Sequence, residues 1–263
     1  MHASTLWLLA GLALFARISN AQTPPADEIV KRASSALYQA AGDFQADVTM
    51  TLANARGAKR ERRLRMLRIN LGEQGEQRYL VVFDSPADVR GLGFLVWKYP
   101  KREDDRWLYF PALKVVKRVA ADDKRSSFVG SDFTYEDISG RDLEEETHAF
   151  VREEKIDDRQ VYVIESKPKQ VTTYSRRVSW IDIERWLPLK EEYFDTRDSL
   201  ARIFKAEKIE SIDGQWTVTS RSMTTVQSKH RTEVIFGNVR YDAGLGEELF
   251  TERSLRNPAA LPR

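Results

Sequence analysis

Apolar and polar residues alternate along most of this chain, and the period of the alternation changes once, near the start. Over residues 26–41 the apolar residues fall at helical spacing, and Asp27 and Glu28 occupy the first turn, where the helix dipole favours negative charge. After Gly42 the period becomes two over residues 44–52, which is the pattern of a half-buried strand. The pattern therefore predicts one N-terminal helix followed by β-structure.

Short apolar or alternating segments separated by turn residues make up the rest of the chain. These segments are residues 62–71, 77–84, 92–99, 106–110, 115–119, 149–155, 160–167, 177–183, 189–195, 199–212, 215–225 and 231–241. Asp213-Gly214 has the composition of a two-residue hairpin turn. We expect roughly ten or eleven consecutive strands, and no helices alternate with them, which argues against a parallel α/β fold.

An antiparallel sheet of this length must curl or close, because its edges are otherwise exposed. The sequence predicts a mainly β fold with a helical lid, in which a strongly curved antiparallel sheet forms a half-open barrel. The helix over residues 26–41 and the segment 120–140 would cover its open side. All-β folds often reach this length as one unit, so residues 22–263 are expected to form a single domain.

Residues 126–138 read SSFVGSDFTYEDI and place aromatic side chains in a segment with neither helical nor strand periodicity. Ordinary loops are polar, so these side chains are expected to cover an apolar surface, as a lid or rim over the mouth of the sheet. The lid or rim residues are Phe128, Phe133, Tyr135 and Ile138. Ser131 or Asp132 is the expected N-cap of a short helix in this lid.

Large apolar side chains are frequent in the predicted strands. Aromatic residues favour strands in any case, so an ordinary packed core is one interpretation. A curled sheet that a single helix cannot fill would instead leave a concave apolar face, and such a face binds apolar ligands. On that interpretation the cavity wall contains Trp97, Leu108, Phe110, Trp180 and Phe204.

The N-terminal sequence indicates export from the cytoplasm. Residues 6–15 form an apolar run that is too short to span a bilayer, and small residues at Ser19 and Ala21 suit cleavage before Gln22. Residues 1–21 are therefore expected to be a cleavable signal peptide, with an uncleaved anchor helix as the alternative. The signal peptide, with no later stretch of transmembrane length, predicts a periplasmic location. The chain has no Cys, so we expect no lipid anchor through an N-terminal Cys.

Charge and motifs argue against several classes of function. The 42 basic and 40 acidic residues are interleaved, which indicates a solvated surface and no nucleic-acid partner. Three His residues without repeated ligand spacing predict no metal site, and we identify no cofactor. The chain contains no nucleophile-elbow, phosphate-loop or dinucleotide motif, so we assign no catalytic residue.

A series of short motifs resembles one bacterial family. The motifs are Arg106 to Pro111 (RWLYFP), Gly130 to Ile138 (GSDFTYEDI), Trp180-Ile181-Asp182, Pro188-Leu189-Lys190, Tyr193-Phe194-Asp195 and Phe250 to Leu255 (FTERSL). In this order they resemble the outer-membrane lipoprotein-sorting proteins, in the superfamily of the periplasmic carriers LolA and LolB. The best local match is to the branch found alongside resistance-nodulation-division type exporters.

This resemblance implies a half-open β-barrel whose cavity shields lipid or lipoprotein acyl chains on the way to the outer membrane. It also implies a non-catalytic monomer, in transient contact with a membrane or membrane protein and with an exporter of that type as a partner. Two other functions stay open: a periplasmic adaptor without cargo, and an enzyme on a β scaffold. A continuous apolar cavity of roughly 300 Å³ or more would favour the carrier, and a solid core would favour the adaptor.

Overall fold

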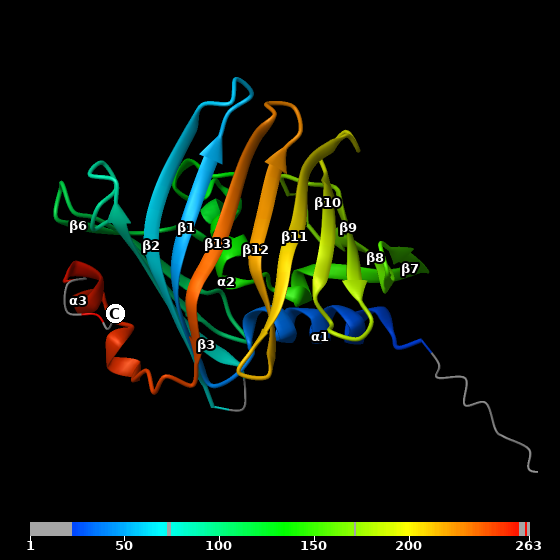
Figure 1. The fold of residues 1–263 in the computed structure, drawn as a ribbon, viewed down its shortest axis with the longest axis horizontal. Coiled ribbons are helices and arrows are strands. Elements are labelled where there is room, and N and C mark those ends of the chain that lie inside the picture. Colours follow the sequence, from blue (N-terminus) through cyan, green and yellow to red (C-terminus); the bar gives the residue numbers. More distant parts are fainter. Residues whose placement is uncertain (1–22, 73–74, 171, 258–260, 262–263) are drawn as a thin grey trace, which may run out of the picture.

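The computed structural model describes residues 23–72, 75–170, 172–257 and 261, and these form one large antiparallel sheet with few helices (Figure 1). The predicted signal peptide, residues 1–21, lies outside the described residues. The sheet has 13 strands in the order β6-β5-β4-β3-β2-β1-β13-β12-β11-β10-β9-β8-β7. No helix in the described part of the chain is long and apolar enough to cross a membrane.

The strands agree closely with the segments expected from the sequence. Their bounds are β1 Asp43–Ala53, β2 Lys59–Leu71, β3 Glu76–Ser85, β4 Gly93–Lys98, β5 Asp105–Phe110, β6 Val115–Arg118, β7 Glu146–Ile156, β8 Arg159–Pro168, β9 Arg176–Asp182, β10 Pro188–Phe194, β11 Leu200–Ile212, β12 Gln215–Thr225 and β13 His230–Tyr241. The α-helices are α1 Ala26–Tyr38, α2 Tyr135–Ser139 and α3 Glu252–Arg256. Short 3₁₀ helices are η1 Ala121–Arg125, η2 Phe128–Gly130, η3 Leu143–Glu145 and η4 Glu247–Leu249.

The strand order makes one chain segment cross the whole sheet. The chain runs outward from β1 to the edge strand β6 and resumes at the opposite edge with β7. It then returns strand by strand to β13, which pairs with β1. Residues 119–145, which we call the lid segment, therefore lie against one face of the sheet. This crossing explains why the segment is rich in aromatic residues, since it must bury itself against that face.

The two faces of the sheet are covered by different elements. α1 packs against β7, β8 and β12 on the face that the lid segment crosses, and α2 appears behind β12 and β13 in Figure 1. The other face of β2 to β5 is covered by the C-terminal segment, whose Leu245, Phe250 and Leu255 are buried against Leu80 and neighbouring residues. The sheet near β4 is therefore apolar on both faces.

The fold prediction is confirmed for its main part and corrected for its shape. The protein is mainly β, with an antiparallel sheet and a helical cover, as expected. The sheet is open, with β6 and β7 as its edges, and it is neither closed nor strongly curled. The predicted edge exposure is limited in another way: β6 has four residues, and β7 has a bulge between Phe150 and Arg152, a feature that discourages pairing with another strand.

Candidate functional site

The space between α1 and the sheet is the candidate site. Asp27 and Glu28 stabilise the first turn of α1, and Ile29, Val30 and Ala33 are buried on the sheet. These three residues contact apolar residues of β8 and β9. The N-terminal part of the helix is thus held by apolar packing.

Hydrogen bonds from the sheet hold the other end of α1. The donors are Arg68, Asn70, Gln77 and Tyr79, and the acceptors are the carbonyls of residues 38–41. Arg68 Nη1 lies 2.8 Å and Gln77 Nε2 2.7 Å from the Tyr38 carbonyl. The last carbonyls of a helix have no partner within it, and a cation there complements the helix dipole. These donors from β2 and β3 therefore fix the C-terminus of α1 through polar contacts.

The aromatic residues of the lid segment are buried in the main core. Phe128 and Tyr135 lie with ring centroids 5.5 Å apart, and both pack on Phe94 of β4. Phe133 is 1% exposed and Ile138 is also buried in this core. The structure therefore places the four predicted lid residues under the surface, where they attach the lid segment to the sheet.

The N-cap of α2 differs from the prediction. Thr134 caps the helix: its hydroxyl accepts from the Asp137 N–H, and its own N–H donates to the Asp137 carboxylate at 2.8 Å. The expected caps, Ser131 and Asp132, were wrong. Asp132 instead accepts hydrogen bonds from Thr225 and Thr232 at 2.5 and 2.7 Å, which tie the lid segment to β12 and β13.

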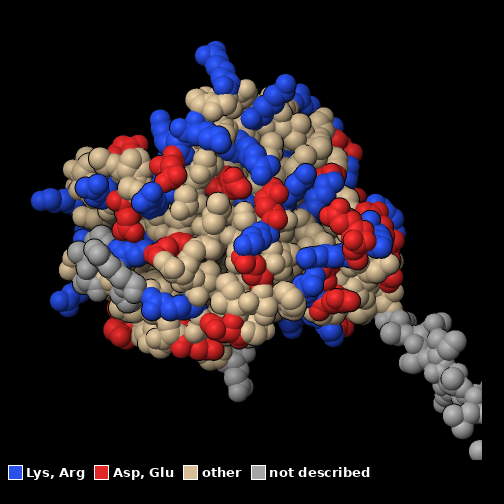
Figure 2. All heavy atoms as spheres, in the orientation of Figure 1, with Lys and Arg blue, Asp and Glu red and all other residues tan. Residues whose placement is uncertain are grey.

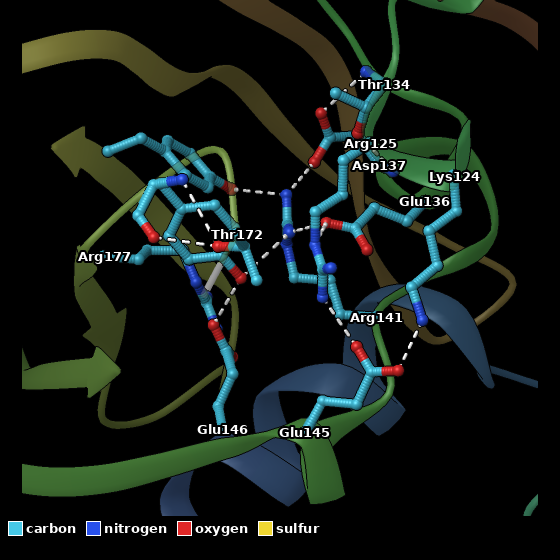
Figure 3. Close-up of polar contacts among 12 residues, drawn as sticks. Lys124, Arg125, Thr134, Glu136, Asp137, Arg141, Glu145, Glu146, Thr172 and Arg177 are labelled. Carbon is cyan, nitrogen blue, oxygen red and sulfur yellow. Dashed lines mark hydrogen bonds and ion pairs between the residues drawn. The ribbon is translucent and has the colours of Figure 1, made fainter. Parts of the chain in front are cut away.

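A buried network of charges joins the lid segment to β7, β9, β10 and β11, and Figure 3 shows the part of it around Arg141, Glu146 and Arg177. Arg141 contacts Glu136 and Asp137 within the lid segment, and Arg202 of β11 reaches Asp137 at 3.0 Å. Arg177 of β9 lies between two carboxylates: 2.7 Å from Glu146 and 2.6 Å from Glu191. Every one of these carboxylates is thus paired with a guanidinium group.

These pairings decide what the network can do chemically. Burial would raise the pKa of Asp137, but Arg141 and Arg202 hold it well below its usual range. Burial also opposes ionisation of Glu146, and Arg177 and Arg141 outweigh it, lowering its pKa to about 2. A general acid or base works best with a pKa near the working pH. At neutral pH these carboxylates stay ionised and paired, so the network serves to hold the lid segment.

Two narrow pockets lie under α1, one on each side of Leu37 and Tyr38. The first has a volume of about 60 Å³ and is lined by Ala33, Phe204 and neighbouring residues of β9 to β12. The second, of about 50 Å³, reaches Phe44 and the exposed Trp216. Both volumes are far below the roughly 300 Å³ at the lower end for ligand pockets. In this closed arrangement, the C-terminal turn of α1 separates and fills the space.

A larger groove of about 530 Å³ runs along the outer side of α1. It is lined mainly by polar and charged residues, among them Lys31, Lys98, His148 and Lys169. It meets the first apolar pocket at Ser34, Arg141 and Leu143, which line both. Polar and apolar spaces thus adjoin under one edge of the helix.

The five predicted cavity-wall residues do not lie together. Phe204 lines the first pocket, and Leu108 and Phe110 face the same core without reaching either pocket. Trp97 and Trp180 lie on the opposite face of the sheet, where Trp97 Nε1 donates to the Phe250 carbonyl at 2.8 Å. Both residues were assigned to the wrong face of the sheet. A shift of one residue along a strand is enough for this error, because successive side chains point to opposite faces.

Polar residues at the pockets were missed by the sequence analysis. Arg141, Arg177 and Arg221 line the first pocket, and Arg68 and Arg221 line the second. The alternation of side chains along each strand could have revealed them. In β9, every second residue (Arg177, Ser179 and Ile181) lies on the face that lines the first pocket. The described residues contain no group of His, Cys, Asp and Glu that could hold a metal ion.

Comparison with known proteins places the chain in a family. A family model described as "Uncharacterized protein" matches residues 75–257. A DUF1329 family protein from Desulfovibrio piger is 31% identical, with 89% of this chain and 100% of that chain covered and a TM-score of 0.81. The chain belongs to this family. Comparison with curated proteins finds no match.

Two further structures extend this result. A domain from Vibrio parahaemolyticus, named for outer membrane lipoprotein sorting, is 30% identical, with 88% of this chain and 98% of that chain covered and a TM-score of 0.81. A LolA superfamily protein from Nitrosomonas europaea is 20% identical, covers 88% of this chain and 100% of that chain, and has a TM-score of 0.69. The fold of this DUF1329 family member is therefore LolA-like, and the resemblance found in the sequence is confirmed.

Gly140, at the end of α2, allows the close approach of α1 and the lid segment. Its φ is +86°, and a Cβ atom there would lie 3.2 Å from the Tyr38 ring. We expect Gly140→Ala to destabilise the protein by about 2 kcal/mol, through backbone strain and displacement of Tyr38. Gly214→Ala is the control, since Gly214 also has positive φ, at +78°, but no atom within 4 Å of the added carbon. Urea unfolding of both variants measures the effect, and equal losses would contradict the role of the Tyr38 contact.

Proposed function

We propose that this protein is a non-catalytic periplasmic carrier that binds lipid or lipoprotein acyl chains for transport towards the outer membrane. The observation that carries the proposal is the pair of pockets under α1, which a movement of one helix would join. No strand pairing has to break for this movement, since α1 is attached by side-chain packing and by polar contacts at its C-terminus. The LolA-like fold and the family of the Vibrio domain, named for outer membrane lipoprotein sorting, support it.

The physical need for such a carrier follows from the hydrophobic effect. Each CH₂ group of an acyl chain exposed to water costs about 0.8 kcal/mol, so transit through an aqueous compartment requires an apolar enclosure. Leu37 and Tyr38 line both pockets, and on this proposal they would move aside to admit the acyl chain. Export by a cleavable signal peptide, partners in a membrane or an exporter of the resistance-nodulation-division type, and a monomeric state all belong to this proposal.

Filling the first pocket tests the proposal. Ala33→Leu adds three carbons where α1 faces the pocket, and we expect it to weaken binding of cis-parinaric acid, a fluorescent fatty acid, by about tenfold, the equivalent of 1.4 kcal/mol. Ala55→Leu, at an exposed position between β1 and β2, is the matched control. Native mass spectrometry of protein purified from the periplasm should also show bound lipid. Absence of both bound lipid and probe binding would overturn the proposal.

The small volume of the pockets favours a second candidate, an adaptor that carries nothing. The predicted threshold for a carrier was roughly 300 Å³, and neither apolar pocket approaches it. An adaptor would keep α1 in place at all times. Hydrogen exchange of α1 with and without fatty acid separates the two: a carrier loses protection in α1 upon binding, whereas an adaptor shows the same protection in both samples.

A further inference from the structure

Arg221 of β12 occupies the point where the two pockets under α1 meet. It lines both of them, together with Leu37 and Tyr38 of α1, and it is only 6% exposed. Its guanidinium lies 5.6 Å from the ring centroid of Phe133 in the lid segment and 4.9 Å from that of Phe236 in β13. Both covering elements, α1 and the lid segment, therefore meet above this one cation.

Arg221 differs from the other buried arginines of the described chain. Those arginines donate hydrogen bonds to carbonyls or carboxylates; they are Arg62, Arg68, Arg78, Arg106 and Arg177. Within the described residues, Arg221 makes no hydrogen bond or ion pair. Its Nε is buried without an acceptor, as is the Nε of each of the other five, but each of those five donates from a terminal nitrogen. Burial lowers the pKa of Arg221, yet an arginine stays charged in proteins. An unpaired buried charge is costly, so the fold alone does not account for it.

The charged residues that line the two pockets also leave Arg221 without a counter-charge. The carboxylates of the first pocket, Asp137 and Glu191, are already paired with Arg141, Arg202 and Arg177. The second pocket has two arginines in its lining and no Asp or Glu among its described lining residues. The space under α1 thus has an excess of positive charge within an apolar surround. A low dielectric strengthens the attraction of such a charge for an anion.

We infer that Arg221 binds the single anionic group of an amphipathic ligand, a carboxylate or a phosphate, whose alkyl chain lies in the joined pockets. This rests on the proposed carrier function and narrows its cargo to anionic single-headed lipids. Such a ligand would supply the acceptor that Arg221 lacks, and aromatic residues on both sides would bury the first carbons of the chain. Residues that reduce stability without a partner in the fold are frequent at binding sites.

The inference predicts opposite effects of one substitution on stability and on binding. Arg221→Met removes an unpaired buried charge and keeps an unbranched side chain, so we expect the ligand-free protein to unfold at a higher urea concentration. We also expect about 10- to 100-fold weaker binding of palmitate, because a hydrogen bond to a charged group is worth about 1.5–3 kcal/mol. Binding of hexadecanol, the uncharged analogue, should change less than about twofold. Arg221→Lys should retain part of the preference for palmitate.

Titration calorimetry or displacement of a neutral fluorescent probe measures these affinities. Arg176→Met, an arginine of β9 outside the pockets, is the control and should leave both affinities unchanged. A parallel series with a lysophosphatidic acid and its neutral monoacylglycerol tells a phosphate ligand from a carboxylate. Equal binding of palmitate and hexadecanol by the unaltered protein, or a destabilised Arg221→Met protein, would overturn the inference and leave the carrier function intact. If neither lipid binds, the carrier function itself fails.

Discussion

Arg177→Met is expected to lower the free energy of unfolding by about 3–5 kcal/mol, the range for breaking a buried ion pair. Arg177 is 6% exposed and lies between the carboxylates of Glu146 and Glu191. Its removal would leave the buried carboxylate of Glu146 and the partly buried carboxylate of Glu191 without their counter-charge. The lid segment ends at Glu145, so loss of the pairing at Glu146 should also loosen the attachment of this segment. Urea unfolding gives the free energy, and hydrogen exchange over residues 119–145 gives the local effect.

The neighbouring arginine provides a matched control. Arg176 is on the same strand, and it pairs with Asp198 at 2.7 Å in a more exposed setting, where the Asp198 side chain is 63% exposed. Exposed ion pairs contribute about 0–1 kcal/mol, so Arg176→Met should have a small effect. Adding Glu146→Gln and Glu191→Gln to Arg177→Met should restore part of the lost stability, because the uncompensated charges are gone. Equal effects of the two single substitutions would show that the network does not stabilise the fold.

The secondary structure could be predicted because each element has a clear period. The helix over residues 26–41 is observed as α1 up to Tyr38, and all the segments identified as strands form strands. The expected number, ten or eleven, was too low: every segment identified from its pattern, the short edge segment 115–119 included, is a strand of the 13-stranded sheet. The strand order could not be predicted in the same way. It depends on which edges pair, and no local pattern records that the lid segment crosses the entire sheet.

The face of each cavity residue was harder to predict than its strand. In β4, residues on both faces are apolar, because the C-terminal segment covers one face and the lid segment the other. A strand buried on both sides reads as a continuous apolar run, so the orientation of Trp97 could not be read from its alternation. Phe204 lies at the first pocket, and its side was easier to read from the sequence because the next residue of β11, Lys205, is charged and exposed.

The buried arginines were missed because composition does not reveal burial. Interleaved charges predicted a solvated surface, and Figure 2 shows both signs spread over the visible face, as expected. The same pattern hides the arginines that point inward. Arg221 lies two residues before Met223 in β12, so both side chains point to the same face, and Met223 is 1% exposed. This alternation was the feature of the sequence that could have placed Arg221 inside the protein. If every Arg in a strand is assumed to face solvent, Arg221 is left out of the predicted site.

Acid is expected to loosen the lid before it unfolds the sheet. A carboxylate with a lowered pKa in the folded protein stabilises it fully above its unfolded pKa, near 4.5 for Glu146, and this stability is lost as the pH falls towards about 2. For Glu146 alone the loss is on the order of 3 kcal/mol. Asp137, whose pKa is also held low by Arg141 and Arg202, adds to it in the same direction.

Comparing Glu146→Gln with the unaltered protein isolates this contribution. The variant is less stable at neutral pH, but its stability should fall less steeply between about pH 4.5 and about pH 2, since one coupled carboxylate is missing. Glu248→Gln removes a glutamate from an exposed position and should leave the slope unchanged. Urea unfolding at a series of pH values gives the slopes, and hydrogen exchange identifies where protection is lost first. Identical slopes in all three proteins would mean that Arg177 does not hold Glu146 ionised, and that this pair adds nothing to the stability of the fold.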